Sequence, residues 1–323
     1  METDVCYHIV AMNISRGAFL KSIGGLSIAV PSVGCRSTVC AGEGFRVSLN
    51  PSTLRGYGLP FLEQVRISAE AGYAGIEPWV KDLHAARADG SLNDAVALAR
   101  DKGLSFVNGI AFGKWSHPDV SVRAAGMEET KRDMALLAEI GCPMIAASIY
   151  GLREDSDPTV PLEDLASRYA DLLALGRSFA VRPLLEYWGH SAHNLVTLED
   201  AIRIATLTGD RDAAVLADIY HTYRGGSSFE SFRFLSSSTL PVLHVNDYPA
   251  TPAASALKDA DRVYPGDGVA PLGRVSEILR ENGVRPWLSL ELFNPCYWKA
   301  TPLATACEGL RKTMSCRLMK EVS

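Results

Sequence analysis

The chain has 323 residues, of which 47% are hydrophobic and 21% charged, and its formal net charge at pH 7 is −5. This composition supplies enough apolar material for a large folded core. The acidic balance argues against a nucleic-acid-binding protein, because phosphate contacts need a basic face. No apolar run approaches the ~20 residues of a membrane-spanning helix. The seven cysteines form no CxxC pair, so we expect buried thiols and not a disulfide or zinc framework.

The first 44 residues differ from the remainder of the chain. Arg16 precedes a short, weakly apolar stretch of small residues, 23–30, and Cys35 follows closely. These features resemble a twin-arginine export signal with a lipid-anchor cysteine, although Gly17 stands where the second arginine is expected. We therefore expect residues 1–44 to be an export leader and the protein to be periplasmic or membrane-anchored. A cytoplasmic protein with an N-terminal extension is the alternative.

From Phe45 to the C-terminus, short β-like runs alternate with helical segments and no composition break appears. The predicted strands are Phe45–Leu49, Gly75–Trp79, Leu104–Ala111, Met144–Tyr150, Arg182–Trp188, Ala213–Tyr220, Val242–Asp247 and Trp287–Phe293. The predicted helices are Pro60–Ala71, Leu92–Lys102, Met127–Ile140, Leu162–Ala180, Leu198–Leu207, Phe229–Ser236, Leu272–Asn282 and Pro302–Met314. Eight strand–helix units predict one domain, residues 45–323, folded as a (β/α)8 TIM barrel. A doubly wound sheet would need a glycine-rich turn after its first strand, which residues 50–54 do not provide.

Two glutamates stand inside predicted strands. Leucines alternate along the last strand at positions 288, 290 and 292, so these side chains should face the helices. Ser289 and Glu291 then point into the barrel, and Glu186 occupies a comparable position in the fifth strand. An ionised carboxylate in a barrel interior is costly unless it is paired or bound to a cation.

The sixth and seventh strands repeat this arrangement with Asp218 and His244. A lone glutamate at a strand end is usually a solvated rim residue, and a lone strand histidine usually belongs to the core. Here Glu186, Asp218, His244 and Glu291 fall on the last four strands, towards the carboxyl ends where barrel enzymes build active sites. Three converging carboxylates would repel one another without a cation. The pattern predicts one divalent metal ion, Mn²⁺, Mg²⁺ or Co²⁺, with Zn²⁺ as a further candidate.

Several ordered motifs between Phe45 and Met314 resemble the xylose isomerase-like barrel superfamily, also called the sugar phosphate isomerases/epimerases. The motifs are Gly72-Tyr73-Ala74-Gly75-Ile76-Glu77, Glu186-Tyr187-Trp188-Gly189-His190, Asp218-Ile219-Tyr220-His221, His244-Val245-Asn246-Asp247, Arg262-Val263-Tyr264-Pro265-Gly266-Asp267-Gly268 and Leu288-Ser289-Leu290-Glu291-Leu292-Phe293-Asn294. The resemblance implies the same four metal ligands, and it implies that His221 and Arg262 bind substrate.

Both of these substrate-binding residues depend on the course of the loops. Positions three apart on a strand point to opposite faces, so His221 can join Asp218 only if the chain turns after Ile219, and residues 222–226 look loop-like. Arg262 follows a long insertion, residues 249–261, which could form a lid or displace the arginine.

Further polar and aromatic residues are candidates for substrate contact. Glu77 lies on the inward face of the second strand, where it could bind substrate hydroxyls or an interior partner. Trp188, with Trp115 and Phe293, could form an apolar platform for a sugar ring.

The family chemistry suits a small carbohydrate substrate. A metal ion chelated by a hydroxy-ketone stabilises an enediolate, and Glu186 and Glu291 could then exchange the carbon-bound proton, giving isomerisation or epimerisation. An exported protein would meet free sugars or keto-sugars. The alternatives are a dehydratase of the inosose or dehydroshikimate kind and a non-catalytic carbohydrate-binding barrel. The acidic charge speaks against the DNA-repair branch of the fold, and a homo-oligomer is compatible with the sequence.

The leader hypothesis predicts that the barrel does not need its N-terminal segment. A chain lacking residues 1–41 should keep its thermal stability and its activity, because the predicted barrel begins at Phe45. Mass spectrometry of the protein from its native host should find a chain that starts after Gly34 or shortly beyond. An unprocessed chain in the cytoplasm would contradict export.

Overall fold

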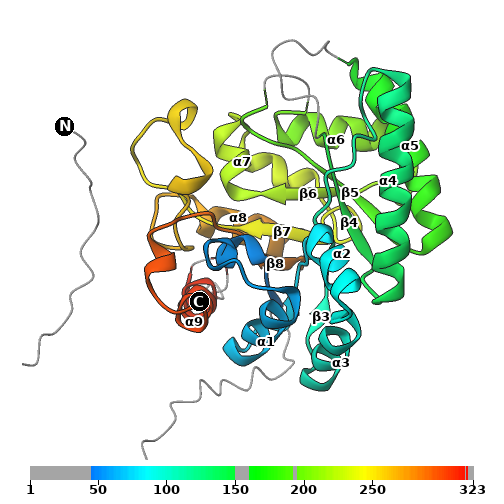
Figure 1. The fold of residues 1–323 in the computed structure, drawn as a ribbon. Helices are drawn as coiled ribbons and strands as arrows, with labels where there is room; N and C mark the ends of the chain where they lie inside the picture. The colour runs from blue at the N-terminus through cyan, green and yellow to red at the C-terminus, as the bar shows by residue number, and fades with distance from the viewer. Residues whose placement is uncertain (1–44, 150–159, 192–194, 317, 319–323) are drawn as a thin grey trace, which may run out of the picture.

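Eight short parallel strands form one curled sheet, and the helices lie around its outside (Figure 1). This computed structural model describes residues 45–149, 160–191, 195–316 and 318; the predicted leader, Cys35 included, lies outside the described residues. The strands are β1 (Val47–Leu49), β2 (Gly75–Ile76), β3 (Ser105–Phe106), β4 (Met144–Ser148), β5 (Arg182–Glu186), β6 (Val215–Asp218), β7 (Val242–Val245) and β8 (Trp287–Leu290). Each lies within a predicted strand and is shorter than predicted.

The strand order around the sheet is β3-β2-β1-β8-β7-β6-β5-β4. The remaining seam is closed by an isolated parallel bridge between Gly109, just beyond β3, and Ile145 of β4. Gly109 donates its N–H to the carbonyl of Met144 and accepts from the N–H of Ala146, both at 2.8 Å. A Cβ atom at Gly109 would lie 2.6 Å from the end of the Leu137 side chain, so a larger residue here would have to displace that side chain. The predicted TIM barrel is confirmed, and the doubly wound alternative is excluded.

Nine α-helices are described. They are α1 (Phe61–Ala71), α2 (Val80–Asp89), α3 (Leu92–Lys102), α4 (Val120–Glu139), α5 (Leu162–Phe179), α6 (Leu198–Leu207), α7 (Ile219–Arg224), α8 (Leu272–Glu281) and α9 (Pro302–Ser315). Short 3-10 helices connect them: η1 (Pro51–Tyr57), η2 (Phe229–Phe234), η3 (Ala254–Ala256), η4 (Asp259–Asp261) and η5 (Tyr297–Lys299). Within the described ranges, none of the helices has both the length and the apolar character of a membrane span.

Apart from α7, which stands where a strand end and a loop were predicted, the helices differ from the prediction in three places. α4 begins at Val120 and not at Met127, because the Asp119 carboxylate caps it by accepting the N–H groups of the next turn. α2 was not predicted: its buried positions are only Val80, Leu83 and Ala86, which is a weak apolar pattern. The predicted helix at 229–236 is the 3-10 helix η2.

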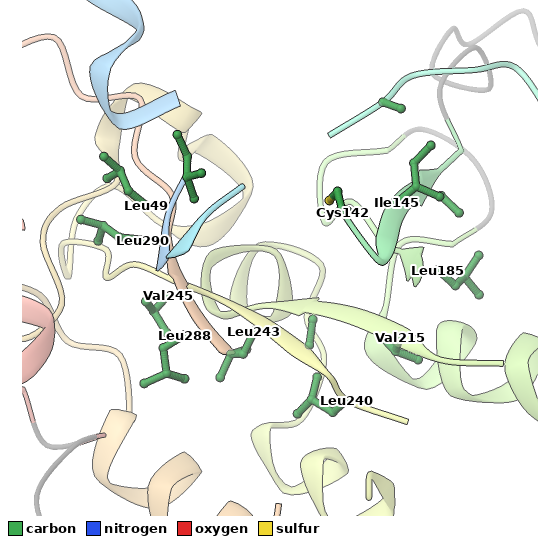
Figure 2. Close-up of a cluster of buried hydrophobic side chains, with 14 of the residues drawn as sticks. Leu49, Cys142, Ile145, Leu185, Val215, Leu240, Leu243, Val245, Leu288 and Leu290 are labelled. Carbon is green, nitrogen blue, oxygen red and sulfur yellow. The ribbon is translucent and has the colours of Figure 1, made fainter. Parts of the chain in front are cut away.

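Side chains of β7 and β8 alternate as the leucine pattern predicted. Leu243, Val245, Leu288 and Leu290 belong to the core between the sheet and the helices, where Figure 2 shows them together. His244, Ser289 and the other inward side chains therefore face the barrel axis. A smaller apolar cluster, which includes Trp79, Leu184, Leu216 and Val242, is separate from this outer core. Three of its members alternate with outward-facing residues of β5, β6 and β7, which places them in the barrel interior.

Candidate metal centre and active site

Four ligand-type side chains lie at the carboxyl ends of four neighbouring strands. Glu186 ends β5, Asp218 ends β6, His244 lies in β7, and Glu291 directly follows β8. Asp218 and His244 are paired across the two central strands. All four are buried, and none exposes more than 5% of its surface. The structure thus brings together the four residues that the sequence analysis selected as metal ligands.

The Nδ1 atom of His244 faces the three carboxylates. It lies 3.3 Å from Glu291 Oε2, 3.7 Å from Asp218 Oδ2 and 3.8 Å from Glu186 Oε1. Nδ1 has no hydrogen-bond partner among the described residues. A buried nitrogen left in this state is costly, whereas one imidazole nitrogen surrounded by carboxylate oxygens is a donor set that suits a divalent cation. Asp218, His244 and Glu291 offer ligand atoms within 4.8 Å of one another.

Glu77 fixes the orientation of the imidazole from its other side. The His244 Nε2 atom lies 3.0 and 3.1 Å from the two Glu77 oxygens. Asn108 Nδ2 donates to the same carboxylate at 2.7 Å and Ser289 Oγ at 2.6 Å. Glu77 is completely buried, so the structure gives it interior partners. An acceptor on Nε2 directs Nδ1 towards the three carboxylates, as the outer partners of metal-binding histidines do.

Asn50, which directly follows β1, connects these groups and was not selected from the sequence. Its Nδ2 donates to Glu77 Oε2 and to Glu291 Oε1, each at 3.1 Å. Its Oδ1 accepts from Trp79 Nε1 at 2.9 Å. Its position could have indicated it from the sequence, because Asn50 stands at the carboxyl end of a barrel strand, as the metal-ligand candidates do.

Arg262 places a buried positive charge against two of the carboxylates. Its Nη1 donates to Glu291 Oε2 at 2.8 Å and to Asp218 Oδ2 at 3.0 Å. Its Nη2 donates to Asp259 Oδ1 at 2.8 Å and lies 3.1 Å from His221 Nε2. Asp259 was not selected from the sequence.

The long insertion does not displace the arginine. Asp247 and Val263 form an antiparallel bridge with two hydrogen bonds of 2.9 Å, which closes residues 249–261 into a loop and returns Arg262 to the site. The guanidinium also lies over the ring of Tyr220, 4.3 Å from its centroid.

These contacts shift the pKa values of the site in different directions. Burial raises the pKa of Glu186 to about 8 against the attraction of His244, and Glu291 and Asp218 add to the rise. Burial alone would also raise the pKa of Glu291, but the charges of His244 and Arg262 hold it below its usual range. Burial would lower the pKa of His244, and its acidic neighbours instead raise it well above its ordinary value. Of these two glutamates, Glu186 is therefore the one whose charge the protein compensates less.

His221 reaches the site because the chain turns at the end of β6. Asp218 is the N-cap of α7, and its Oδ1 accepts from the His221 N–H at 2.8 Å. The predicted turn after Ile219 is present, although the chain is helical to Arg224 where a loop was expected. Burial lowers the pKa of His221 well below its usual range, so the ring is neutral. A side chain at Gly189 would lie 2.4 Å from the His221 carbonyl, so the close approach of β5 and α7 depends on this glycine.

An aromatic row borders the site. Trp79 packs against Phe112 with ring centroids 5.3 Å apart, and Phe112 packs against Trp188 at 6.1 Å. The side chain of Trp188 forms a hydrogen bond with Glu186. Trp115 belongs instead to the outer core: it packs against Tyr169 and donates its indole N–H to a backbone carbonyl. The expected platform thus contains Phe112 and not Trp115.

A second group of ligand-type side chains lies beside the first. His190, His221 and Asp259 offer ligand atoms within 4.8 Å of one another. The Arg262 guanidinium contacts both His221 and Asp259, so a cation already lies among these residues. Arg262 also contacts Asp218 and Glu291 of the first group, but that group adds a third carboxylate, Glu186, which faces His244. We therefore assign the metal to the first group.

Comparisons with known proteins agree with this geometry. Residues 65–313 match a family model described as a xylose isomerase-like TIM barrel. An inosose isomerase of Bacillus subtilis is 26% identical over 185 residues. The match covers 57% of this chain and 64% of that protein, which is less than two thirds of its length. A 3-dehydroshikimate dehydratase of Pseudomonas aeruginosa is 24% identical over 260 residues, 78% of this chain and 39% of that protein. The crystal structure of the IOLI protein with a bound zinc atom superposes with a TM-score of 0.75 at 23% identity, covering 83% of this chain and 96% of that one.

The Asn50 contacts predict a large effect of one isosteric substitution. Asn50→Asp keeps the oxygen that accepts from Trp79 but replaces the donor to Glu77 and Glu291 with another acceptor. The free energy of unfolding should fall by about 3–5 kcal/mol, the usual cost of an uncompensated buried charge. Urea denaturation at pH 8 measures this loss.

The matched control is Asn93→Asp on the exposed surface of α3, which should change stability by less than about 0.5 kcal/mol. Equal stabilities of the two variants would show that Asn50 does not connect the acidic groups.

Proposed function

Because this chain belongs to the xylose isomerase-like TIM barrel family, we propose that it is a divalent-metal-dependent isomerase or epimerase of a sugar or keto-sugar. One observation carries the proposal: His244 Nδ1, which has no hydrogen-bond partner among the described residues, faces three carboxylate oxygens at 3.3–3.8 Å. Two of these carboxylates, Glu186 and Glu291, come from strands on either side of β6 and β7. They are therefore suited to contact a substrate from two directions.

Glu186, Asp218, His244 and Glu291 would hold the ion. Three oxygen donors and one nitrogen donor suit Mn²⁺, Mg²⁺, Co²⁺ or Zn²⁺. When bound, such an ion polarises a substrate carbonyl and stabilises the negative charge of an enediolate. The Glu77 carboxylate contacts the Nε2 atom of His244 and so leaves Nδ1 directed towards the ion.

The protein's own side chains would move the proton. One of Glu186 and Glu291 removes the proton from the carbon beside the carbonyl, and the other returns it to the same or the adjacent carbon. Return to the opposite face of the same carbon gives an epimer, and return to the neighbouring carbon gives an isomer. Arg262 holds Glu291 in place through a hydrogen bond of 2.8 Å. The guanidinium of Arg262 and the imidazole of His221 lie 3.1 Å apart and would offer nitrogen atoms to substrate oxygens. Trp188 offers an apolar face for the carbon skeleton.

The relatives support a keto-carbohydrate substrate. The name of the Bacillus subtilis relative, inosose isomerase, describes such chemistry. The Pseudomonas aeruginosa relative favours a second candidate, a dehydratase, since its match spans 78% of this chain. In that reaction the enediolate expels a β-hydroxyl group and no second proton returns to carbon. Incubation of ketoses, keto-sugars and inososes with the Mn²⁺-loaded protein, read by NMR, separates isomer, epimer and dehydrated product.

We also propose that residues 1–44 direct export. The support is the sequence alone, in which Arg16, the small-residue stretch 23–30 and Cys35 follow one another as in export signals. An exported enzyme would act on sugars outside the cytoplasm.

The first prediction of this proposal concerns metal content. Asp218→Ala and Glu291→Ala should each lose the bound ion, because each removes an oxygen that faces His244. Glu128→Ala, on the exposed surface of α4, is the matched control and should keep full occupancy. Elemental analysis of dialysed protein measures the ion. A fully occupied Glu291→Ala protein would refute the four-ligand assignment.

The second prediction separates proton transfer from metal binding. Glu186→Gln and Glu291→Gln keep an oxygen ligand but lose the base, so turnover should fall by roughly 10²–10⁴-fold. In deuterated water the parent protein should place deuterium on the carbon beside the carbonyl, and each variant should lose this exchange.

His221→Ala should lower turnover while metal occupancy stays near that of the parent, since His221 lies outside the set of four ligands. Normal exchange and turnover in Glu186→Gln would mean that Glu186 is a ligand only. The two-base mechanism would then be wrong.

A further inference from the structure

A cavity of about 210 Å³ lies beside the metal centre, between η1 and the start of α2. Its lining includes two cationic side chains, Arg55 and Lys81, the indole of Trp79 and the polar side chains Ser52, Gln64 and Asp82. The cavity holds several times the roughly 30 Å³ that one water molecule occupies. It is smaller than the roughly 300–1,000 Å³ of pockets that enclose a whole drug-sized ligand. Its size suits one substituent of a larger molecule.

The two cations gather on one aromatic ring. The Arg55 guanidinium carbon and the Lys81 Nζ each lie 5.0 Å from the centroid of Trp79. Among the described residues, neither side chain forms a hydrogen bond or an ion pair. The indole compensates each positive charge only in part. An anion in the cavity that both residues line could pair with either of them.

Two buried polar atoms in the lining also lack a partner. Ser52 is 1% exposed, and its Oγ has no hydrogen-bond partner among the described residues. Gln64 Oε1 is in the same state, whereas Gln64 Nε2 donates to the Leu59 carbonyl and to Asp82 Oδ2. A serine hydroxyl can donate to an oxyanion, and an amide oxygen can accept from a hydroxyl. Buried polar groups are rarely left unsatisfied, so a ligand that reached these two atoms would need both an acceptor and a donor.

The cavity is coupled to the metal centre through one side chain. Trp79 Nε1 donates to Asn50 at 2.9 Å, and Asn50 in turn donates to Glu291 at 3.1 Å. Trp79 thus belongs both to the hydrogen-bond chain of the metal centre and to the wall of the cavity. Asp82, whose Oδ2 accepts from Gln64, is the one carboxylate in the lining and opposes two cations.

We propose that this cavity binds an oxyanion carried by the substrate, so that the enzyme acts on an acidic sugar. The substrate role rests on the proposed isomerase or epimerase function. The anion site itself does not depend on that function. A carboxylate and a phosphate share the chemistry that Arg55, Lys81 and Ser52 recognise. Titration with inorganic phosphate and with acetate distinguishes a phosphate group from a carboxylate.

The direct test is a calorimetric titration of the full chain with inorganic phosphate and, separately, with acetate. At least one of them should bind the parent protein. Arg55→Ala and Lys81→Ala should each weaken that binding about tenfold, the factor that corresponds to 1.4 kcal/mol. Asp82→Asn should strengthen it, because it removes the opposing charge. Lys131→Ala, an exposed cation on α4, should change nothing.

The same titration of the Asp218→Ala protein distinguishes the cavity from the metal centre. Phosphate or acetate should bind this variant as tightly as the parent, since Asp218 does not line the cavity. Loss of binding in Asp218→Ala, or equal binding by the parent and by the Arg55→Ala/Lys81→Ala double variant, would overturn the anion site. Both cations are exposed, so the double variant should fold, and its circular dichroism checks this.

Steady-state kinetics test the link to the substrate. With a ketose that carries the preferred oxyanion, the double variant should raise KM at least tenfold and leave kcat near that of the parent. With the neutral ketose, both constants should be unchanged. Equal KM values of the parent for the acidic and the neutral ketose would refute the substrate role. If no ketose is converted while anion binding still depends on Arg55 and Lys81, the proposed function fails and the anion site stands.

Discussion

Mutual repulsion among buried carboxylates is the constraint around which the rest of this barrel is arranged. Glu77, Glu186, Asp218 and Glu291 are all buried, and all lie close to the single imidazole of His244. Charges taken out of water persist only when opposite charges and hydrogen bonds compensate them. Each neighbour of this cluster can be understood by the charge that it balances.

Arg262 and His244 supply the compensation that the protein itself provides. Arg262 neutralises the Asp218 and Glu291 side of the cluster, and the raised pKa of His244 shows how strongly its acidic neighbours favour a proton there. On the Glu186 side no arginine or lysine of the described residues forms an ion pair with the carboxylate, and burial dominates its pKa. That imbalance, with a His244 Nδ1 that has no hydrogen-bond partner among the described residues, is the physical reason for proposing a divalent cation here.

Asn50 has a different part in the same arrangement. It is neutral, and it can donate to two carboxylates while it accepts from the Trp79 indole. One amide thereby links the acidic centre to the wall of the cavity that contains Arg55 and Lys81. An acidic interior beside a basic cavity would orient a substrate that has a polar carbonyl end and an anionic end. Its carbonyl would lie towards the carboxylates and its anion towards the cations.

The sequence by itself predicted the barrel and placed four ligand-type residues at one end of it. Strand periodicity is local: the leucines at 288, 290 and 292 direct Glu291 inwards whatever the rest of the chain does. The same logic applies to Glu186, Asp218 and His244, because parallel strands bring equivalent positions to one end of the barrel. The local N-cap at Asp218, which turns the chain towards His221, also needed no distant partner.

The tertiary structure alone decided which side chains contact these four residues. Asn50 meets Glu291 across 241 positions of the sequence, and Glu77 meets His244 across 167. The return of Arg262 depends on a bridge between Asp247 and Val263, which the loop length left open. Arg55 and Lys81 line one cavity only because η1 and α2 both lie against the same indole. Such contacts depend on loop paths and packing between distant segments, and no local periodicity encodes them.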